Sequence, residues 1–205
     1  MSMIRGRKAI VFSIVVVFMF AIALAGNAQA CVGRKLVLGS VEDARSSLVS
    51  RMLSILINER TGTTVEIEFF PNEEKLYEMV KKHKVDLFVG YVDQFMNRLD
   101  DSPGELGMEE KFKLVKRKFD EEQNMIWLKP MGFSGRDETG SSLGWGATVV
   151  RKSVLKKFPA LPRLLEKIGT RITLDDEILD SLVDRVPESK PARVARDFLK
   201  EKKLI

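Results

Sequence analysis

Apolar residues follow two different spacings along the chain, and these spacings predict an alternation of strands and helices. Short apolar or alternating runs, which are typical of strands, occupy residues 35–41, 64–70 and 85–90. Between these runs, apolar residues recur every three or four positions, which predicts helices that bury one face. Short links between such elements favour a right-handed arrangement around a parallel sheet. The pattern therefore predicts an α/β fold with a mostly parallel sheet.

The helical spacing continues in the second half of the chain. Met108, Phe112, Val115 and Phe119 form one stripe amid Glu and Lys, and we interpret this stripe as core and not as a cofactor site. Further helices are predicted at residues 151–158, at 161–168, after a capping box at 173–176, and after Ser189 and Pro191.

Residues 125–152 connect the predicted elements of the first half of the chain to those of the second half. Residues 125–128 predict a buried strand that stops at Pro130, and residues 147–150 predict a second short strand. The Gly- and Ser-rich residues between them predict a connection and not an element. Loops at strand ends carry ligands in many α/β proteins, so this connection is a candidate ligand loop. An ordinary surface loop is the alternative.

The first 30 residues have the features of an export signal. Arg5, Arg7 and Lys8 precede an uncharged stretch at 9–24, and Ala28-Gln29-Ala30 has the small residues that signal cleavage requires. An uncleaved membrane anchor is the alternative. We expect export, with residues 31–205 forming one folded lobe.

Cys31 is the only cysteine and directly follows the predicted cleavage site. A disulfide within the chain is therefore excluded. Its position resembles that of the lipid-modified cysteine of bacterial lipoproteins, although the residue three positions before it is Ala28 and not Leu. We predict lipidation of Cys31 and a location on the cell envelope, with release into the periplasm as the alternative.

Charge and motifs exclude several classes of function. Residues 31–205 hold 31 basic and 29 acidic residues. The sequence shows no cluster of basic and aromatic residues of the kind that predicts nucleic-acid binding. No nucleophile elbow, metal-ligand cluster or nucleotide-binding fingerprint is present, so we predict neither an enzyme nor a cofactor. Ser40, Glu42 and Asp43 lie where the first strand ends and the next helix starts, and they are either helix caps or ligand contacts.

Two parts of the sequence resemble a known family. Residues 35–91, with Gly39-Ser40 after the first strand, form the first part. The second comprises Ile-Trp-Leu-Lys-Pro-Met-Gly-Phe at 126–133 and the segments at 149–152, 158–161, 172–173 and 194–199. Together they resemble the substrate-binding proteins of glycine betaine/choline-type ABC transporters, which are type II periplasmic binding proteins. The resemblance implies a three-layer α/β lobe and a quaternary-ammonium or amino-acid-like solute.

The sequence departs from that family at the Gly- and Ser-rich connection. The family inserts a second lobe there, whereas this chain has only about a dozen residues. We therefore predict that the second lobe is missing and that the protein cannot close around its ligand as a two-lobed trap.

The family holds quaternary ammonium groups in aromatic cages. By resemblance, Tyr91 would face the ligand, and Phe133 and Trp145 could add ring faces. Packing over the shortened edge is the alternative for Phe133 and Trp145. A homodimer across these two residues would supply a second wall.

The function predicted from the sequence is a non-enzymatic solute-binding component, or an accessory, of an ABC importer with its permease as partner. The alternative is an envelope interaction or scaffold protein that retains one lobe without binding solute. The predicted ligand contacts are Ser40, Glu42, Tyr91, Phe133 and Trp145.

Overall fold

The first half of the chain folds into the alternating strands and helices that its apolar pattern predicts. A computed structural model describes residues 35–98, 106–136, 139–171 and 174–205. The elements of the first half are β1 (Leu36–Val41), α2 (Ala44–Thr61), β2 (Val65–Phe70), α3 (Glu73–Lys81) and β3 (Leu87–Tyr91). Asp43 and Asn72 cap α2 and α3 by accepting from backbone N–H groups, and Gly62 ends α2 with a φ of 69°. Local capping chemistry thus fixes these boundaries.

The second half adds two strands and a series of helices. They are α4 (Val92–Met96), α5 (Met108–Gln123), β4 (Met125–Arg136), β5 (Ser142–Arg151), α6 (Lys152–Lys157), α7 (Leu161–Leu165), α8 (Lys167–Thr170), α9 (Asp176–Asp184) and α10 (Pro191–Glu201). The short helix α4 was not predicted. The helix expected over 161–168 is divided at Glu166 into α7 and α8, and Ile168 and Gly169 within α8 have non-helical backbone angles.

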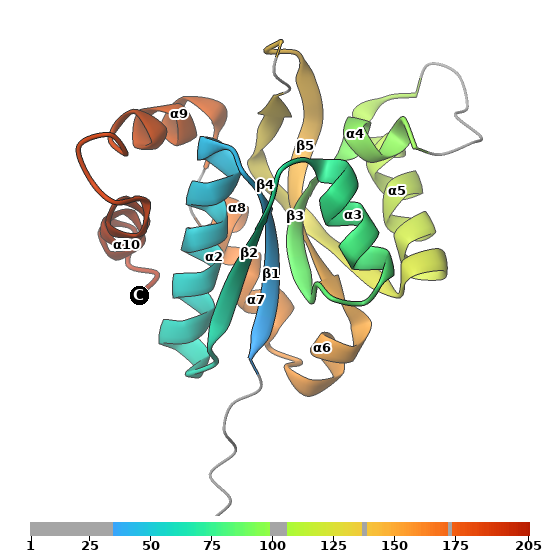
Figure 1. Ribbon diagram of the computed structural model, residues 1–205, viewed down its shortest axis with the longest axis horizontal. Helices are drawn as coiled ribbons and strands as arrows, with labels where there is room; N and C mark the ends of the chain where they lie inside the picture. The colour runs from blue at the N-terminus through green and yellow to red at the C-terminus, as the bar shows by residue number, and fades with distance from the viewer. Residues whose placement is uncertain (1–34, 99–105, 137–138, 172–173) are drawn as a thin grey trace, which may run out of the picture. The chain divides into compact units, whose positions relative to one another are not determined.

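The five strands form one mixed sheet in the order β2-β1-β3-β5-β4 (Figure 1). β1 pairs in parallel with β2 and β3, whereas β5 pairs antiparallel with β3 and β4. The expectation of a mostly parallel sheet is therefore corrected to a mixed sheet. For β4 and β5 the reason is that only five residues, 137–141, separate them, and so short a connection requires antiparallel pairing.

The connection expected between residues 128 and 147 is in fact most of a β-hairpin. β4 continues past Pro130 to Arg136, and β5 already begins at Ser142. The prediction that Pro130 ends the strand was wrong. β4 is paired only with β5 and forms an edge of the sheet, and edge strands tolerate proline. Register shifts on both sides of Pro130 accommodate it.

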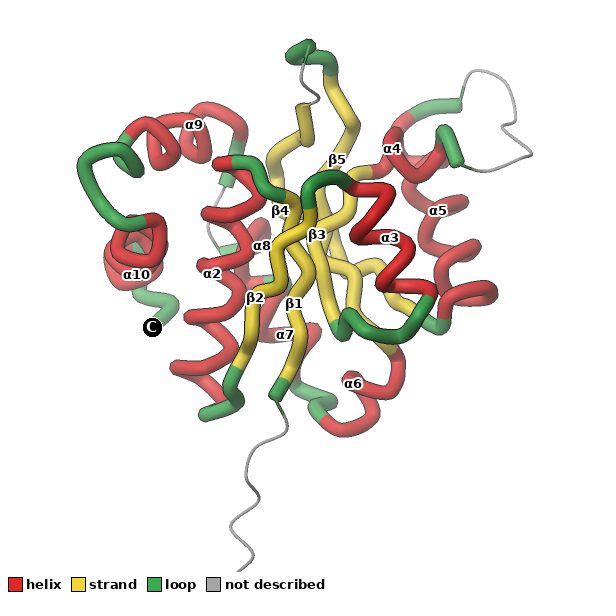
Figure 2. The backbone as a smooth tube through the Cα atoms, in the orientation of Figure 1, coloured by secondary structure: helices red, strands yellow, loops and turns green. Residues whose placement is uncertain are grey.

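Helices cover both faces of the sheet, as the three-layer prediction requires (Figure 2). One face buries α2 together with α7, α8, α9 and α10, and the other buries α3, α4 and α5. The predicted apolar stripe of α5 packs inward through Val115 and Phe119. Residues 35–205 form one unit, so the C-terminal helices complete the same lobe that the first strands begin.

The last two helices, α9 and α10, differ from the prediction only at the start of α9. α9 is capped by Asp175, whose side chain accepts from the Ile178 N–H. Thr173, the cap predicted from the sequence, lies outside the described residues. Pro191 occupies the first position of α10 as predicted, and Val194, Phe198 and Leu204 are buried.

Candidate functional site

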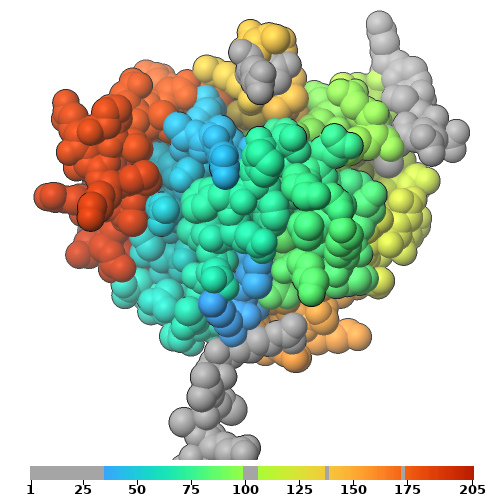
Figure 3. Space-filling view, viewed as in Figure 1, coloured from blue at the N-terminus to red at the C-terminus, as the bar shows by residue number. Residues whose placement is uncertain are grey.

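A pocket of about 690 Å³ lies at the edge of the sheet where β1 and β2 end. Its walls come from the β1–α2 turn, the β2–α3 turn and the hairpin near Arg136 and Thr139. Figure 3 shows the start of α2 in blue, the start of α3 in green and the hairpin tip in orange gathered at this surface. Ligands of α/β folds bind at the carboxyl ends of strands, and the volume suits a small molecule.

Three carboxylates line this pocket: Glu42, Asp43 and Glu73. Asp43 is engaged as a cap, since its Oδ1 accepts from the Ser46 N–H at 2.8 Å. Among the described residues, Glu42 and Glu73 form no ion pair. Their charge therefore faces the pocket without a protein partner in that part of the chain.

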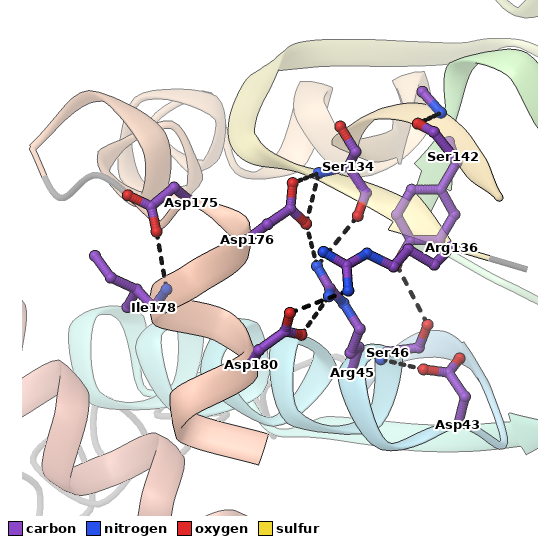
Figure 4. Close-up of polar contacts among 12 residues, drawn as sticks. Asp43, Arg45, Ser46, Ser134, Arg136, Ser142, Asp175, Asp176, Ile178 and Asp180 are labelled. Atoms are coloured by element: carbon purple, nitrogen blue, oxygen red, sulfur yellow. Dashed lines mark hydrogen bonds and ion pairs between the residues drawn. The ribbon is translucent and has the colours of Figure 1, made fainter. Parts of the chain in front are cut away.

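Two arginines also line the pocket, but α9 neutralises both (Figure 4). The Arg45 guanidinium, with 14% of its side chain exposed, pairs with Asp176 and Asp180. Its Nη2 also donates to the Ser134 carbonyl at 3.2 Å. The Arg136 Nη1 lies 3.2 Å from Asp180 Oδ2. The pocket's remaining charge is thus negative, which attracts cations.

Tyr91 and Phe133, two of the predicted cage residues, lie together in the core. Their ring centroids are 6.3 Å apart in an edge-on arrangement, and the two residues are 6% and 1% exposed. The Tyr91 hydroxyl lies 3.4 Å from Ser46 Oγ in the first turn of α2. Burial raises the pKa of Tyr91 to about 12. Neither ring presents an open face to the pocket.

Trp145 lies on the other face of the sheet. Its ring packs 6.3 Å from that of Phe112 on α5, and the residue is 37% exposed. Phe133 belongs to the core beneath α2, whereas Phe112 packs against the core beneath α5. The structure therefore does not bring Trp145 together with Tyr91 and Phe133.

The remaining predicted residues have separate positions. Ser40 is 2% exposed, and its hydroxyl donates to the Val41 carbonyl at 3.2 Å. Glu42 lines the pocket. Cys31 lies outside the described residues. Of the predicted ligand contacts, Glu42 alone is among the residues that line the cavity.

Sequence reasoning missed the residues that shape this site, namely Arg45, Glu73, Arg136, Asp176 and Asp180. One signal was available, because Arg45 lies in the first turn of a helix, where a cation opposes the helix dipole. Such a position indicates an acidic partner from elsewhere in the fold. The sequence does not identify that partner, since Asp180 is 135 positions away.

The described residues contain no group of three or more His, Cys, Asp or Glu side chains placed to hold a metal ion. Within the same ranges, no helix has both the length and the apolar character needed to cross a bilayer. The chemistry that the pocket offers is therefore charge recognition by carboxylates beside paired arginines.

Two solved structures share this fold. One is described as a glycine betaine/carnitine/choline ABC transporter, with a TM-score of 0.70, 11% identity, and coverage of 84% of this chain and 99% of that chain. The other is apo YehZ from Escherichia coli, with a TM-score of 0.72, 13% identity, and coverage of 84% and 100%. Identities this low show the fold alone. A comparison with curated proteins finds no significant match.

The sequence itself matches a family model over residues 34–140, and that model is described as the substrate-binding domain of the ABC-type glycine betaine transport system. The matched region contains β1 to β4 and all the carboxylates and arginines that line the pocket. This match confirms the family resemblance that the sequence motifs indicated. The chain belongs to the substrate-binding domain family of ABC-type glycine betaine transport systems.

Proposed function

We propose that this protein is a solute-binding component of an ABC importer and that it binds a small cationic or zwitterionic solute, of the glycine betaine or choline type, in the pocket beside Glu42 and Glu73. Family membership supports a solute-binding role. The negative charge left in the pocket is the observation that carries the choice of solute. In this proposal the protein works outside the cytoplasmic membrane, with a permease as partner.

The ammonium group would lie near the Glu42 and Glu73 carboxylates. A solute carboxylate, where present, would lie toward Arg136, which retains 47% side-chain exposure while paired with Asp180. Recognition would then depend on charge, because Tyr91 and Phe133 are packed in the core. Tyr91 would act indirectly, by supporting Ser46 and the first turn of α2.

Affinity should be low, because the residues that line the pocket all come from one folded unit. Exposed charges interact by roughly 1 kcal/mol at about 4 Å in a water-like dielectric, and immobilising the solute opposes binding. We expect a dissociation constant closer to about 1 mM than to about 1 μM. A homodimer that closes the pocket would raise the affinity.

Calorimetric titration with glycine betaine, choline, carnitine and proline tests the proposal. Binding should weaken about fivefold in Glu73→Gln and again in Glu42→Gln, since each change removes roughly 1 kcal/mol of attraction. Glu109→Gln on α5 makes the same charge change outside the pocket, in an ion pair with Lys113, and should bind like the wild type. Equal binding by all four proteins would contradict the proposed site.

The buried rings favour one alternative function. A lobe whose would-be cage residues pack in the core or on the opposite face could serve as an envelope interaction or scaffold protein without solute binding. The same titration separates the two, because a scaffold would give no heat with any of the four solutes while remaining folded by circular dichroism.

A further inference from the structure

A second pocket lies at the opposite edge of the sheet, where α2 ends. It has a volume of about 600 Å³ and is lined by the last turn of α2 and by residues of α7 and α8. Its charged lining residues are Arg60, Arg163, Lys167 and Arg171. No carboxylate lines it, whereas the pocket at the other edge contains three.

In the described part of the chain, none of these cations forms an ion pair, and Arg60 alone among them has a side-chain hydrogen-bond partner. Arg60 donates from Nε to the Leu204 carbonyl at 2.6 Å and lies in the last turn of α2, where the helix dipole favours a cation. Within the described ranges, the side chains of Arg163, Lys167 and Arg171 form no ion pair or hydrogen bond. Four like charges around one cavity repel each other, and a bound anion would offset that repulsion.

The nearest acids along the sequence are already paired elsewhere. Glu59 Oε1 lies 2.5 Å from Arg196 Nη1, and Glu166 Oε2 lies 3.7 Å from Lys129 Nζ. The pocket lined by these four cations is therefore a local concentration of positive charge. The nearly neutral net charge of the folded residues does not reveal it.

The chain enters the fold at the same edge. β1 begins at Leu36, whose N–H donates to the Thr64 carbonyl at 2.9 Å, and Thr61 of the same turn region lines the pocket. Figure 1 shows β1 starting at the end of the sheet where α2 finishes. Cys31 precedes Lys35 by four positions, a span of at most about 14 Å at roughly 3.5 Å per residue.

We propose that the pocket formed by Arg60, Arg163, Lys167 and Arg171 binds the phosphate of an anionic phospholipid headgroup. Charge complementarity selects an anion, and phosphate accepts several charge-assisted hydrogen bonds from guanidinium groups. The short distance along the chain from Cys31 to Lys35 favours a lipid over a free phosphate as the ligand. An acyl chain on Cys31, or an uncleaved segment at 9–24, would hold this edge of the sheet next to the bilayer. Each cation near an anionic surface contributes about fivefold to the affinity, which is roughly 1 kcal/mol.

The test uses the full chain carrying Cys31→Ser, which removes the site of acylation. Partition is measured on vesicles of phosphatidylcholine alone and of phosphatidylcholine with phosphatidylglycerol. We expect the anionic lipid to increase binding, and we expect Arg163→Gln with Arg171→Gln to reduce that increase about 25-fold. Both arginines are exposed, so the variant should fold normally. The control variant, Lys116→Gln with Arg117→Gln, removes two exposed cations of α5. It should leave the increase in binding caused by the anionic lipid nearly unchanged.

Two results would overturn the proposal. An equal loss in both double variants would show that only overall charge matters. Saturable calorimetric binding of inorganic phosphate that depends on Arg163 and Arg171, with vesicle partition independent of them, would assign the pocket to a free anion instead of a lipid. Binding to anionic vesicles that inorganic phosphate weakens at constant ionic strength would support a headgroup phosphate.

Discussion

Tyr91 offers the sharpest test of the site, because a core residue and an exposed cage residue respond differently to truncation. Tyr91 is 6% exposed, and its ring packs edge-on against Phe133. Truncating a buried aromatic side chain costs about 3–5 kcal/mol of unfolding free energy, whereas an exposed ligand contact would cost about 0.5 kcal/mol or less. We therefore expect Tyr91→Ala to destabilise the protein by about 3–4 kcal/mol.

Gly135 provides a matched second change, because it lies against the face of the same ring. A Cβ at this position would lie 2.5 Å from Tyr91 Cγ and Cδ1, which is an overlap. Gly135 is not among the glycines with positive φ, so its backbone accepts alanine. Gly135→Ala should thus cost about 1–3 kcal/mol by overpacking alone.

The double variant distinguishes this packing from unrelated effects. Once Tyr91→Ala has removed the ring, the added methyl group fills part of the cavity, so Gly135→Ala should become neutral or stabilising. The coupling energy between the two changes should therefore be about 1–3 kcal/mol and favourable. Urea unfolding of the four proteins, followed by tryptophan fluorescence and circular dichroism, measures this energy. Changes that add within about 0.5 kcal/mol would refute the packing described here.

Three further predictions concern pH, a buried cation and the N-terminal region. The pKa of Tyr91 is raised from 10.0 to about 12, so the stability that its protonated hydroxyl contributes is present below pH 10 and is lost as the pH rises toward 12. Over that range, the unfolding free energy of Tyr91→Phe should fall by about 2–3 kcal/mol less than that of the wild type. Arg151→Met should destabilise by about 2–4 kcal/mol, because the buried carbonyls of Val80 and Val85 lose their guanidinium donor, and complete rescue by Arg151→Lys would contradict this account. Finally, we expect mass spectrometry of the native protein to find Cys31 acylated, and an unmodified Cys31 at the mature N-terminus would disprove lipidation.

The sequence predicted those elements whose boundaries depend on local chemistry. α2 follows from its apolar residues at helical spacing, its Asp43 cap and its Gly62 stop, all of which act within a few residues. α3 follows from the Asn72 cap and one buried face that includes Leu76 and Val80. Each of these signals works through neighbouring atoms, so the order of residues is sufficient to read it.

The hairpin was misread because its strands carry residues that usually mark loops. Gly132 and Gly144 have φ values of 104° and 77°, which allow the irregular pairing of β4 and β5, and Gly146 lets the Phe133 ring approach the backbone. Proline and glycine normally break strands. Here an edge position and a close ring contact make them acceptable, and both depend on tertiary structure.

Most of the candidate site could not be predicted from the sequence, because it too depends on tertiary structure. Arg45, Ser134 and Asp180 come from three distant elements, and no periodicity links them. Tyr91 was expected to face a ligand because of the resemblance to the family. The structure instead buries it, since the longer hairpin brings Phe133 and Gly135 against its ring.

The two pockets show why net charge was a poor guide to function in this chain. Composition predicted a nearly neutral lobe, and a net charge close to zero argues against a strong role for electrostatics in ligand binding. The fold separates the charges by sheet edge, with Glu42 and Glu73 at the carboxyl ends of the strands and Arg163 and Arg171 at the opposite edge. Surface charges act over about 8 Å at physiological ionic strength, so each pocket responds to its own charges and not to the total. A cationic solute at one edge and an anionic headgroup at the other are therefore compatible within one lobe.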